Sequence, residues 1–277
     1  MRRAILLGSL LLLFGTAPAF ACAGKIVSSA AGAPLIYNPF APLDARQEIA
    51  IKVQNTGSDR CAYQLSIPDR YLPLQFTPNL RFTIAAGLGW QGAFSAVTPV
   101  LQPGQSHDAR LTLLVYRGQT ATGGTVSRLI GFSLTPAGDR TAVDEVQLNL
   151  SCITPPLFAI DLAGSGRRTS MEFTSLNTNG TRSVVMHTRA TQGHRLEFQS
   201  TTGHLLREGS PASELSTIPF VLAVDGQTYT LSQGTVLRIQ GDAGESSHLL
   251  TVRIGDTRNK LAGTYKAVIT VRIASNM

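Results

Sequence analysis

The chain has 277 residues, of which 43% are hydrophobic and 15% charged, and its formal net charge is +7 at pH 7. It is longer than one small domain, since domains most often contain about 100–150 residues. Its basic residues are scattered and do not form the Lys- and Arg-rich stripe with aromatic neighbours that is typical of nucleic-acid-binding proteins. The composition therefore favours two globular domains and argues against a nucleic-acid partner.

The N-terminus is typical of a secretory signal peptide. Two arginines precede an apolar run over residues 4–14, and small residues follow as far as Ala21. We expect cleavage after Ala21, which removes residues 1–21 and leaves 22 basic and 17 acidic residues, a net charge of +5. Cys22 would then be the first mature residue, so its acylation is an alternative. No other run approaches the roughly 20 apolar residues of a membrane-spanning helix, so no membrane span is expected.

The rest of the chain has the sequence pattern of a β protein. Short runs rich in β-branched and aromatic residues are separated by Gly, Pro, Asn, Asp and Ser, and no long segment has a helical period. The predicted strands cover residues 47–53, 61–67, 110–116, 125–134 and 143–150, and then 183–188, 194–200, 218–224, 248–254 and 264–274. Two adjacent prolines at residues 155–156 predict a stiff connector, with one domain at residues 22–154 and a second at residues 155–277.

An internal repeat relates the two predicted domains. Residues 124–134 align without gaps on residues 263–273, and each copy is a Gly-Thr pair that begins an alternating strand. A shorter match joins residues 63–67 to residues 194–198. We therefore expect two related β domains in tandem.

Three cysteines in an exported chain predict one disulfide and one free thiol. Counted along the repeat, Cys152 takes the place of Cys22, whereas the place of Cys61 falls near Gln192. The second domain thus has only one of the two cysteines of the pair. We therefore expect a Cys22–Cys61 bond, with Cys152 free and buried at the head of domain two. A bond between Cys61 and Cys152 is the alternative, because sequence alone does not fix connectivity.

No residue pattern predicts catalysis, a cofactor or a metal site. Gly87, Gly89 and Gly92 have the spacing of a dinucleotide-binding loop, but the residues that follow do not begin a helix. The histidines lack metal-ligand spacing, and no serine has the context of a nucleophile elbow. We expect a binding protein and not an enzyme.

Several short motifs follow one another in a characteristic order. A cysteine and Tyr37-Asn-Pro-Phe precede an alternating strand that ends in a cysteine, a polar Gly-Gln loop and a closing Gly-Thr strand. In the second half, the motifs run from Met171-Glu-Phe-Thr-Ser-Leu through Ile218-Pro-Phe-Val-Leu to Leu261-Ala-Gly-Thr-Tyr265. This order resembles the spore coat protein U domain, which is shared with the secreted subunits of archaic chaperone-usher pili; the first half resembles a more diverged copy. The resemblance implies an all-β fold of two tandem immunoglobulin-like sandwiches, the second lacking one strand.

The resemblance also implies partners and a location. A periplasmic chaperone lends the missing strand, and at the outer-membrane usher the N-terminal extension of a neighbouring pilus subunit replaces it, so the protein ends in a surface fimbrium. With cleavage after Ala21, no strand precedes Cys22 to be donated, which implies a tip adhesin that mediates attachment or biofilm formation. Its first domain would bind a receptor, and its second would be the pilin domain. The alternatives are a free-standing secreted coat or matrix protein and a periplasmic pilus chaperone.

Two sets of side chains are the expected functional sites. The resemblance implies that the donor-strand groove is lined or bordered by Tyr265, Ile269, Val271 and Ile273. A glycine-rich apolar loop in the first domain suggests a receptor-binding patch with Trp90, Phe94 and Tyr71. The alternative is that Trp90 and Phe94 are ordinary core residues, since large aromatic side chains are mostly buried.

Overall fold

The computed structural model describes residues 21–86, 94–163, 167–173 and 175–276. The predicted signal peptide lies outside the described residues, except for Ala21. Within the described part, the regular secondary structure consists of strands and one short 3-10 turn, η1 (Asp69–Tyr71), which confirms the all-β prediction. None of its described helical segments is long and apolar enough to cross a membrane.

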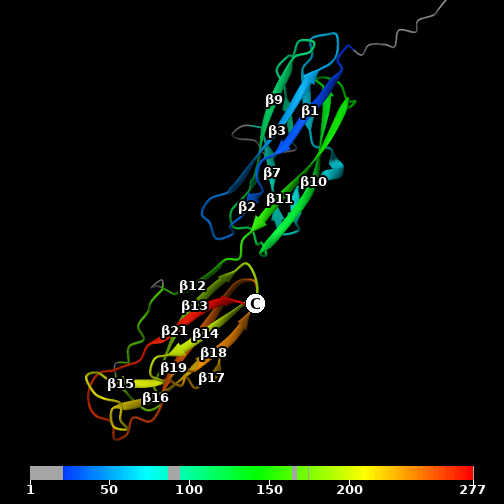
Figure 1. Ribbon diagram of the computed structural model, residues 1–277. Coiled ribbons are helices and arrows are strands. Elements are labelled where there is room, and N and C mark those ends of the chain that lie inside the picture. Colours follow the sequence, from blue (N-terminus) through cyan, green and yellow to red (C-terminus); the bar gives the residue numbers. More distant parts are fainter. Residues whose placement is uncertain (1–20, 87–93, 164–166, 174, 277) are drawn as a thin grey trace, which may run out of the picture.

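The first half of the chain forms a sandwich of two sheets, with strand orders β1-β3-β9-β7 and β2-β11-β10-β4-β8 (Figure 1). Along β3, Ile49, Ile51 and Val53 face the core and are fully buried, while the residues between them are exposed. A short hairpin of β5 (Gln75–Thr77) and β6 (Leu80–Arg81) completes this half. The strand bounds are β1 Gly24–Ala31, β2 Leu35–Ile36, β3 Ala45–Asn55, β4 Tyr63–Ser66, β7 Thr83–Ala85, β8 Ser95–Val97, β9 Ser106–Val115, β10 Gly124–Pro136 and β11 Asp144–Thr154.

The second half forms another sandwich. One sheet has the order β12-β13-β19-β16-β15-β20, with β17 also paired to β16, and the other has the order β18-β14-β21. The strand bounds are β12 Phe158–Leu162, β13 Thr181–Ala190, β14 His194–Ser200, β15 His204–Arg207, β16 Thr217–Val224, β17 Gln227–Tyr229, β18 Val236–Gly241, β19 Gly244–Ile254, β20 Tyr265–Lys266 and β21 Ile269–Ser275. The single strand predicted at residues 264–274 is wrong: the chain changes sheets there, so that β20 pairs with β15 and β21 with β14.

The two sandwiches share the register of equivalent strands. Where β10 pairs with β4, Ser133 lies opposite Ser66; where β21 pairs with β14, Arg272 lies opposite Glu197. These are the residues that the two sequence matches align, Ser133 with Arg272 and Ser66 with Glu197. The sequence repeat is therefore also a repeat of strand pairing.

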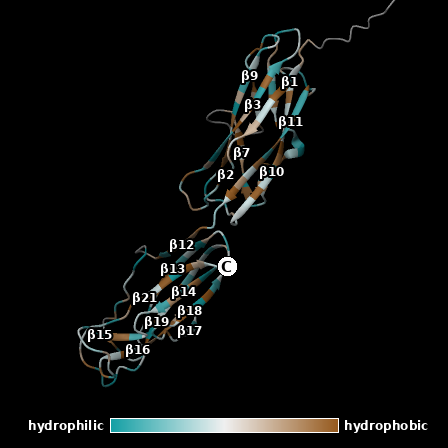
Figure 2. Cartoon of the chain, in the orientation of Figure 1, coloured by the Kyte–Doolittle hydropathy of each residue, from teal (hydrophilic) through white to brown (hydrophobic). Residues whose placement is uncertain are grey.

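The two cores differ in completeness, although polar and apolar residues alternate along strands of both sandwiches (Figure 2). Among the described residues, 24 buried residues form the first core and 11 apolar residues pack on it partly buried. The second core has nine buried residues and 13 partly buried ones. In the second sandwich, most apolar side chains at the core thus retain contact with solvent.

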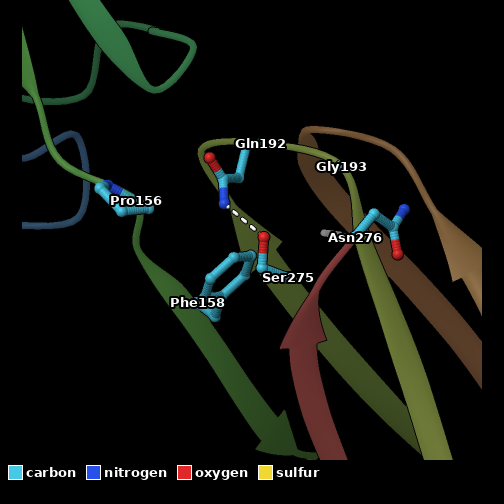
Figure 3. A pocket seen from close by; sticks show the side chains of 6 residues that line it. All are labelled: Pro156, Phe158, Gln192, Gly193, Ser275 and Asn276. Atoms are coloured by element: carbon cyan, nitrogen blue, oxygen red, sulfur yellow. Dashed lines mark hydrogen bonds between the residues drawn. The ribbon is translucent and has the colours of Figure 1, made fainter.

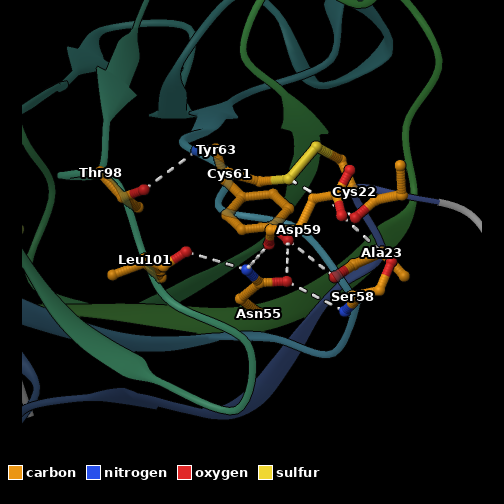
Figure 4. Close-up of a disulfide and its surroundings, with 11 residues drawn as sticks. Cys22, Ala23, Asn55, Ser58, Asp59, Cys61, Tyr63, Thr98 and Leu101 are labelled. Carbon is orange, nitrogen blue, oxygen red and sulfur yellow. Dashed lines mark hydrogen bonds between the residues drawn. A yellow bond between two sulfur atoms is a disulfide. The ribbon is translucent and has the colours of Figure 1, made fainter.

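The cysteines follow the predicted pairing. A disulfide joins Cys22, just before β1, to Cys61, just before β4 (Figure 4). Beside it, the Tyr63 hydroxyl lies 2.7 Å from the carbonyl oxygen of Ala23 and 2.8 Å from Oδ1 of Asn55. Cys152 is free and buried as predicted, but it lies within β11 and packs in the first core, not at the head of a second domain. The alternative bond between Cys61 and Cys152 is not formed.

Candidate functional site

The site is the edge of β21 that faces away from β14, and we call it the open edge. In the first sandwich, β10 pairs with β4 on one side and with β11 on the other. In the second, β21 pairs with β14, and no strand of the described residues pairs with its other edge. An unpaired edge presents backbone N–H and C=O groups that can bind a further strand.

Burial at equivalent positions shows what the missing neighbour leaves uncovered. The core-facing residues of β10 are fully buried: Ile130, Phe132 and Leu134. Their equivalents in β21 are only partly buried: Ile269, Val271 and Ile273. The pairing of β10 with β4 has the same register as that of β21 with β14, so it does not explain the difference in burial. The difference follows from β11, which flanks β10 and has no counterpart beside β21 among the described residues.

Apolar residues of the opposite sheet lie beside the open edge. Strand β12 contacts β21, and its Ile160 and Leu162 are partly buried against the same core. On the outer side of β21, Thr270 and Arg272 are exposed. An incoming strand with alternating side chains would therefore meet apolar residues on one face and polar residues on the other.

A pocket of about 550 Å³ lies at the end of the open edge (Figure 3). Its lining comes from the start of β12, the turn between β13 and β14, and the end of β21: Pro156, Phe158, Gln192, Gly193, Ser275 and Asn276. The Gln192 amide donates to the Ser275 hydroxyl over 2.8 Å, which ties the turn to β21. The Phe158 ring lies between the ribbons of β12 and β21 in this view, so the pocket has an apolar wall and a polar rim.

A buried histidine lies next to this pocket. The His194 ring is 6.4 Å from the Phe158 ring, centre to centre, and His194 is 1% exposed. Neither of its ring nitrogens has a hydrogen-bond partner among the described residues. Burial lowers the pKa of His194, because a charged imidazolium would lose its hydration. The histidine is therefore neutral in the fold at neutral pH.

The structure brings together three of the four predicted groove residues and separates the fourth. Ile269, Val271 and Ile273 share the core-facing side of β21, whereas Tyr265 belongs to β20 and its hydroxyl donates to the carbonyl oxygen of Leu261 over 2.6 Å. Sequence reasoning missed the contribution of β12, including Ile160. The signal was present in the sequence, since residues 158–162 alternate and begin one residue after the two prolines.

The predicted receptor-binding residues do not form one patch in the described structure. Trp90 lies outside the described residues. Phe94 is 6% exposed and packs edge-on against Phe132 at 6.1 Å, so the core interpretation holds for it and the binding interpretation does not. Tyr71 lies on the opposite side of β10, where its ring covers Gly131, and the Gln147 amide donates to its hydroxyl over 2.7 Å.

Within residues 21–86, 94–163, 167–173 and 175–276, no cluster of three or more His, Cys, Asp or Glu residues could hold a metal ion. The site that the structure does show is the open edge of β21.

The sequence matches no protein-family model and none of the curated proteins. Among solved structures, it is similar to a chain of the CsuC–CsuE chaperone–tip adhesion subunit pre-assembly complex from archaic Csu pili of Acinetobacter baumannii, with 11% identity, a TM-score of 0.36 and coverage of 78% of this chain and 85% of that one. It is also similar to CfaE, the adhesive subunit of CFA/I fimbria of enterotoxigenic Escherichia coli, with 15% identity, a TM-score of 0.38 and coverage of 94% and 83%. At these TM-scores the similarities assign no function to this chain.

Proposed function

We propose that the protein is a secreted pilus subunit of the chaperone-usher type, whose second sandwich accepts a β-strand from another protein at the open edge. The observation that carries this proposal is the contrast between equivalent strands: β10 is flanked by β11, whereas β21 has no described neighbour on that side. The role is one of binding and assembly, without catalysis.

Strand addition fits the chemistry of the open edge. An added strand would pair with the free backbone groups of β21, and its apolar side chains would cover Ile269, Val271 and Ile273. Burying a partly exposed side chain of this kind contributes on the order of 1 kcal/mol, about half the value for complete burial. A chain with this edge uncovered is expected to associate through it, because exposed edges pair with other strands.

The partners and route follow from the sequence resemblance. We propose that a periplasmic chaperone supplies the strand first and that a neighbouring pilus subunit replaces it at the outer-membrane usher. Export through the inner membrane would use the predicted signal peptide. The first sandwich contains its own strand beside β10, so it needs no donated strand. We assign it the receptor-binding role, which places the subunit at the tip of a surface fimbrium.

The test supplies the missing strand from the chain itself. By the repeat offset, Asn276 is the equivalent of Ala137, so a second copy of Gly138–Thr154 appended after Asn276 reproduces the β10–β11 connection and strand. Cys152→Ser in the copy avoids a new thiol. The extension is expected to raise the free energy of unfolding of the second sandwich, measured by hydrogen exchange. It should also raise the yield of soluble monomer, measured by size-exclusion chromatography.

The matched control carries the same extension with serine at its three apolar core-facing positions, which are copied from Val146, Leu148 and Leu150. It should give no stabilisation, because the backbone alone cannot cover the apolar residues of β21. If the unextended chain is already monomeric and the extension leaves its stability unchanged, the strand-acceptor function is wrong. A free-standing coat or matrix protein, or a complete periplasmic chaperone, would then take its place.

A further inference from the structure

We infer that the open edge selects an incoming strand that carries an acidic side chain opposite Arg272. The inference rests on the proposed strand-acceptor function and adds the chemistry of the partner.

Arg272 is the charged residue on the outer side of β21. It is exposed and lies opposite Glu197 of β14. The Glu197 carboxylate is already shared by two other arginines, with Oε1 3.0 Å from Nε of Arg195 and 3.2 Å from Nε of Arg238. These contacts, that with Arg238 foremost, lower the pKa of Glu197. The outer face of this three-stranded sheet thus holds three arginines around one glutamate.

Arg272 forms no ion pair with any residue that the structure describes. Its side towards β14 meets a carboxylate that two other cations already contact, and its other side is the open edge. A strand added there would place one residue directly beside Arg272, on the same outer face. Opposite charges at such cross-strand positions are stabilising, and like charges are destabilising.

The first sandwich shows which residue would occupy this position. Ser133, the equivalent of Arg272, lies opposite Glu145 of β11. The two sandwiches share the same register on the other side of these strands, with Ser133 opposite Ser66 and Arg272 opposite Glu197. A strand bound antiparallel to β21 in the register of β11 therefore places its Glu145 equivalent next to Arg272.

The cation that balances this acid differs between the sandwiches. In the first, Glu145 forms an ion pair with Arg70 of η1, and the uncharged Ser133 lies opposite it. In the second, Arg272 itself stands in the place of Ser133. The expected partner strand thus has an acidic residue at the position of Glu145. Apolar residues follow one, three and five positions later, as Val146, Leu148 and Leu150 do in β11.

This arrangement gives selectivity as well as affinity. An apolar alternating pattern alone would let many strands cover Ile269, Val271 and Ile273. A lysine or arginine at the position equivalent to Glu145 would lie beside Arg272. The outer face of the β18-β14-β21 sheet already has an excess of positive charge there. The edge would therefore reject basic strands whose apolar pattern fits equally well.

The test is a charge exchange in the extended chain. Six proteins combine Arg272, Arg272→Glu or Arg272→Gln with an extension that has Glu145 or Glu145→Lys in the copied strand. With Arg272, the acidic extension should give a folding equilibrium constant for the second sandwich about two- to fivefold larger than the basic one at low salt. Arg272→Glu should reverse the preference, and Arg272→Gln should abolish it. In 1 M salt the preference should shrink, because exposed charges are screened.

The matched control is Arg253→Glu, which makes the same charge change at an exposed position of β19 in the other sheet. It should leave the preference of the Arg272 chain for the acidic extension unchanged. If both extensions stabilise the second sandwich equally with Arg272 present, the inference is wrong while strand acceptance stands. If neither extension stabilises it, strand acceptance is wrong and the inference falls with it.

Discussion

Ile130→Ala and Ile269→Ala remove the same atoms from equivalent positions of the two sandwiches. Ile130 is 0% exposed in β10, which β11 flanks, whereas Ile269 is partly buried beside the open edge. Truncating a fully buried isoleucine to alanine costs about 2–5 kcal/mol, so we expect about 4 kcal/mol for Ile130→Ala. With part of its side chain in solvent, Ile269→Ala should cost about half as much, roughly 2 kcal/mol.

Adding the copied strand should remove this difference. In the extended chain Ile269 becomes covered as Ile130 is, so Ile269→Ala should then cost about 4 kcal/mol. Hydrogen exchange with mass spectrometry on the full chain measures each sandwich separately, through peptides from β4 and β14. Equal losses for the two variants in the unextended chain, or an unchanged loss for Ile269→Ala in the extended one, would refute the assignment of an open edge.

Three further predictions concern stability and reactivity. Burial holds the pKa of His194 below its usual value, so on acidification the unfolded chain gains a proton at this residue before the folded chain does. The second sandwich should therefore lose stability as the pH falls below about 6.5. In urea unfolding at several pH values, His194→Leu should reduce this dependence of stability on pH. Reducing the Cys22–Cys61 bond, which spans 39 residues, should cost the first sandwich about 4 kcal/mol and leave the second unchanged in denaturant titrations with and without reductant. Burial raises the pKa of Cys152 to about 11, so mass spectrometry should detect its alkylation by a maleimide only after unfolding.

Much of the architecture was predictable because strand formation here follows local alternation. The repeat of residues 124–134 at 263–273 predicted related domains, and the structure adds that the register of pairing is repeated as well. The change of sheet between β20 and β21 was not predictable, because the alternation of residues 264–274 continues through it. For the same reason the sequence pattern places Tyr265 on one face with Ile269, although Tyr265 lies in β20 of the other sheet.

The composition of the site depended on tertiary pairing that a sequence pattern does not contain. Phe94 reads equally well as a loop anchor or a core residue, and only its contact with Phe132 decides between them. The role proposed for Arg272 likewise cannot be predicted from the sequence. It depends on two tertiary contacts: Glu197 lies opposite Arg272 and already contacts two other arginines.

The most direct test of strand acceptance is residue-resolved amide exchange along β21, recorded by NMR for the unextended and extended chains. In an edge strand, alternate N–H groups point away from the neighbouring strand and exchange with solvent. We predict that alternate amides of Ile269–Ser275 exchange rapidly in the unextended chain and become protected in the extended one, while those of β10 are protected in both. Full protection of β21 in the monomeric unextended chain would contradict the open edge and, with it, the proposed function.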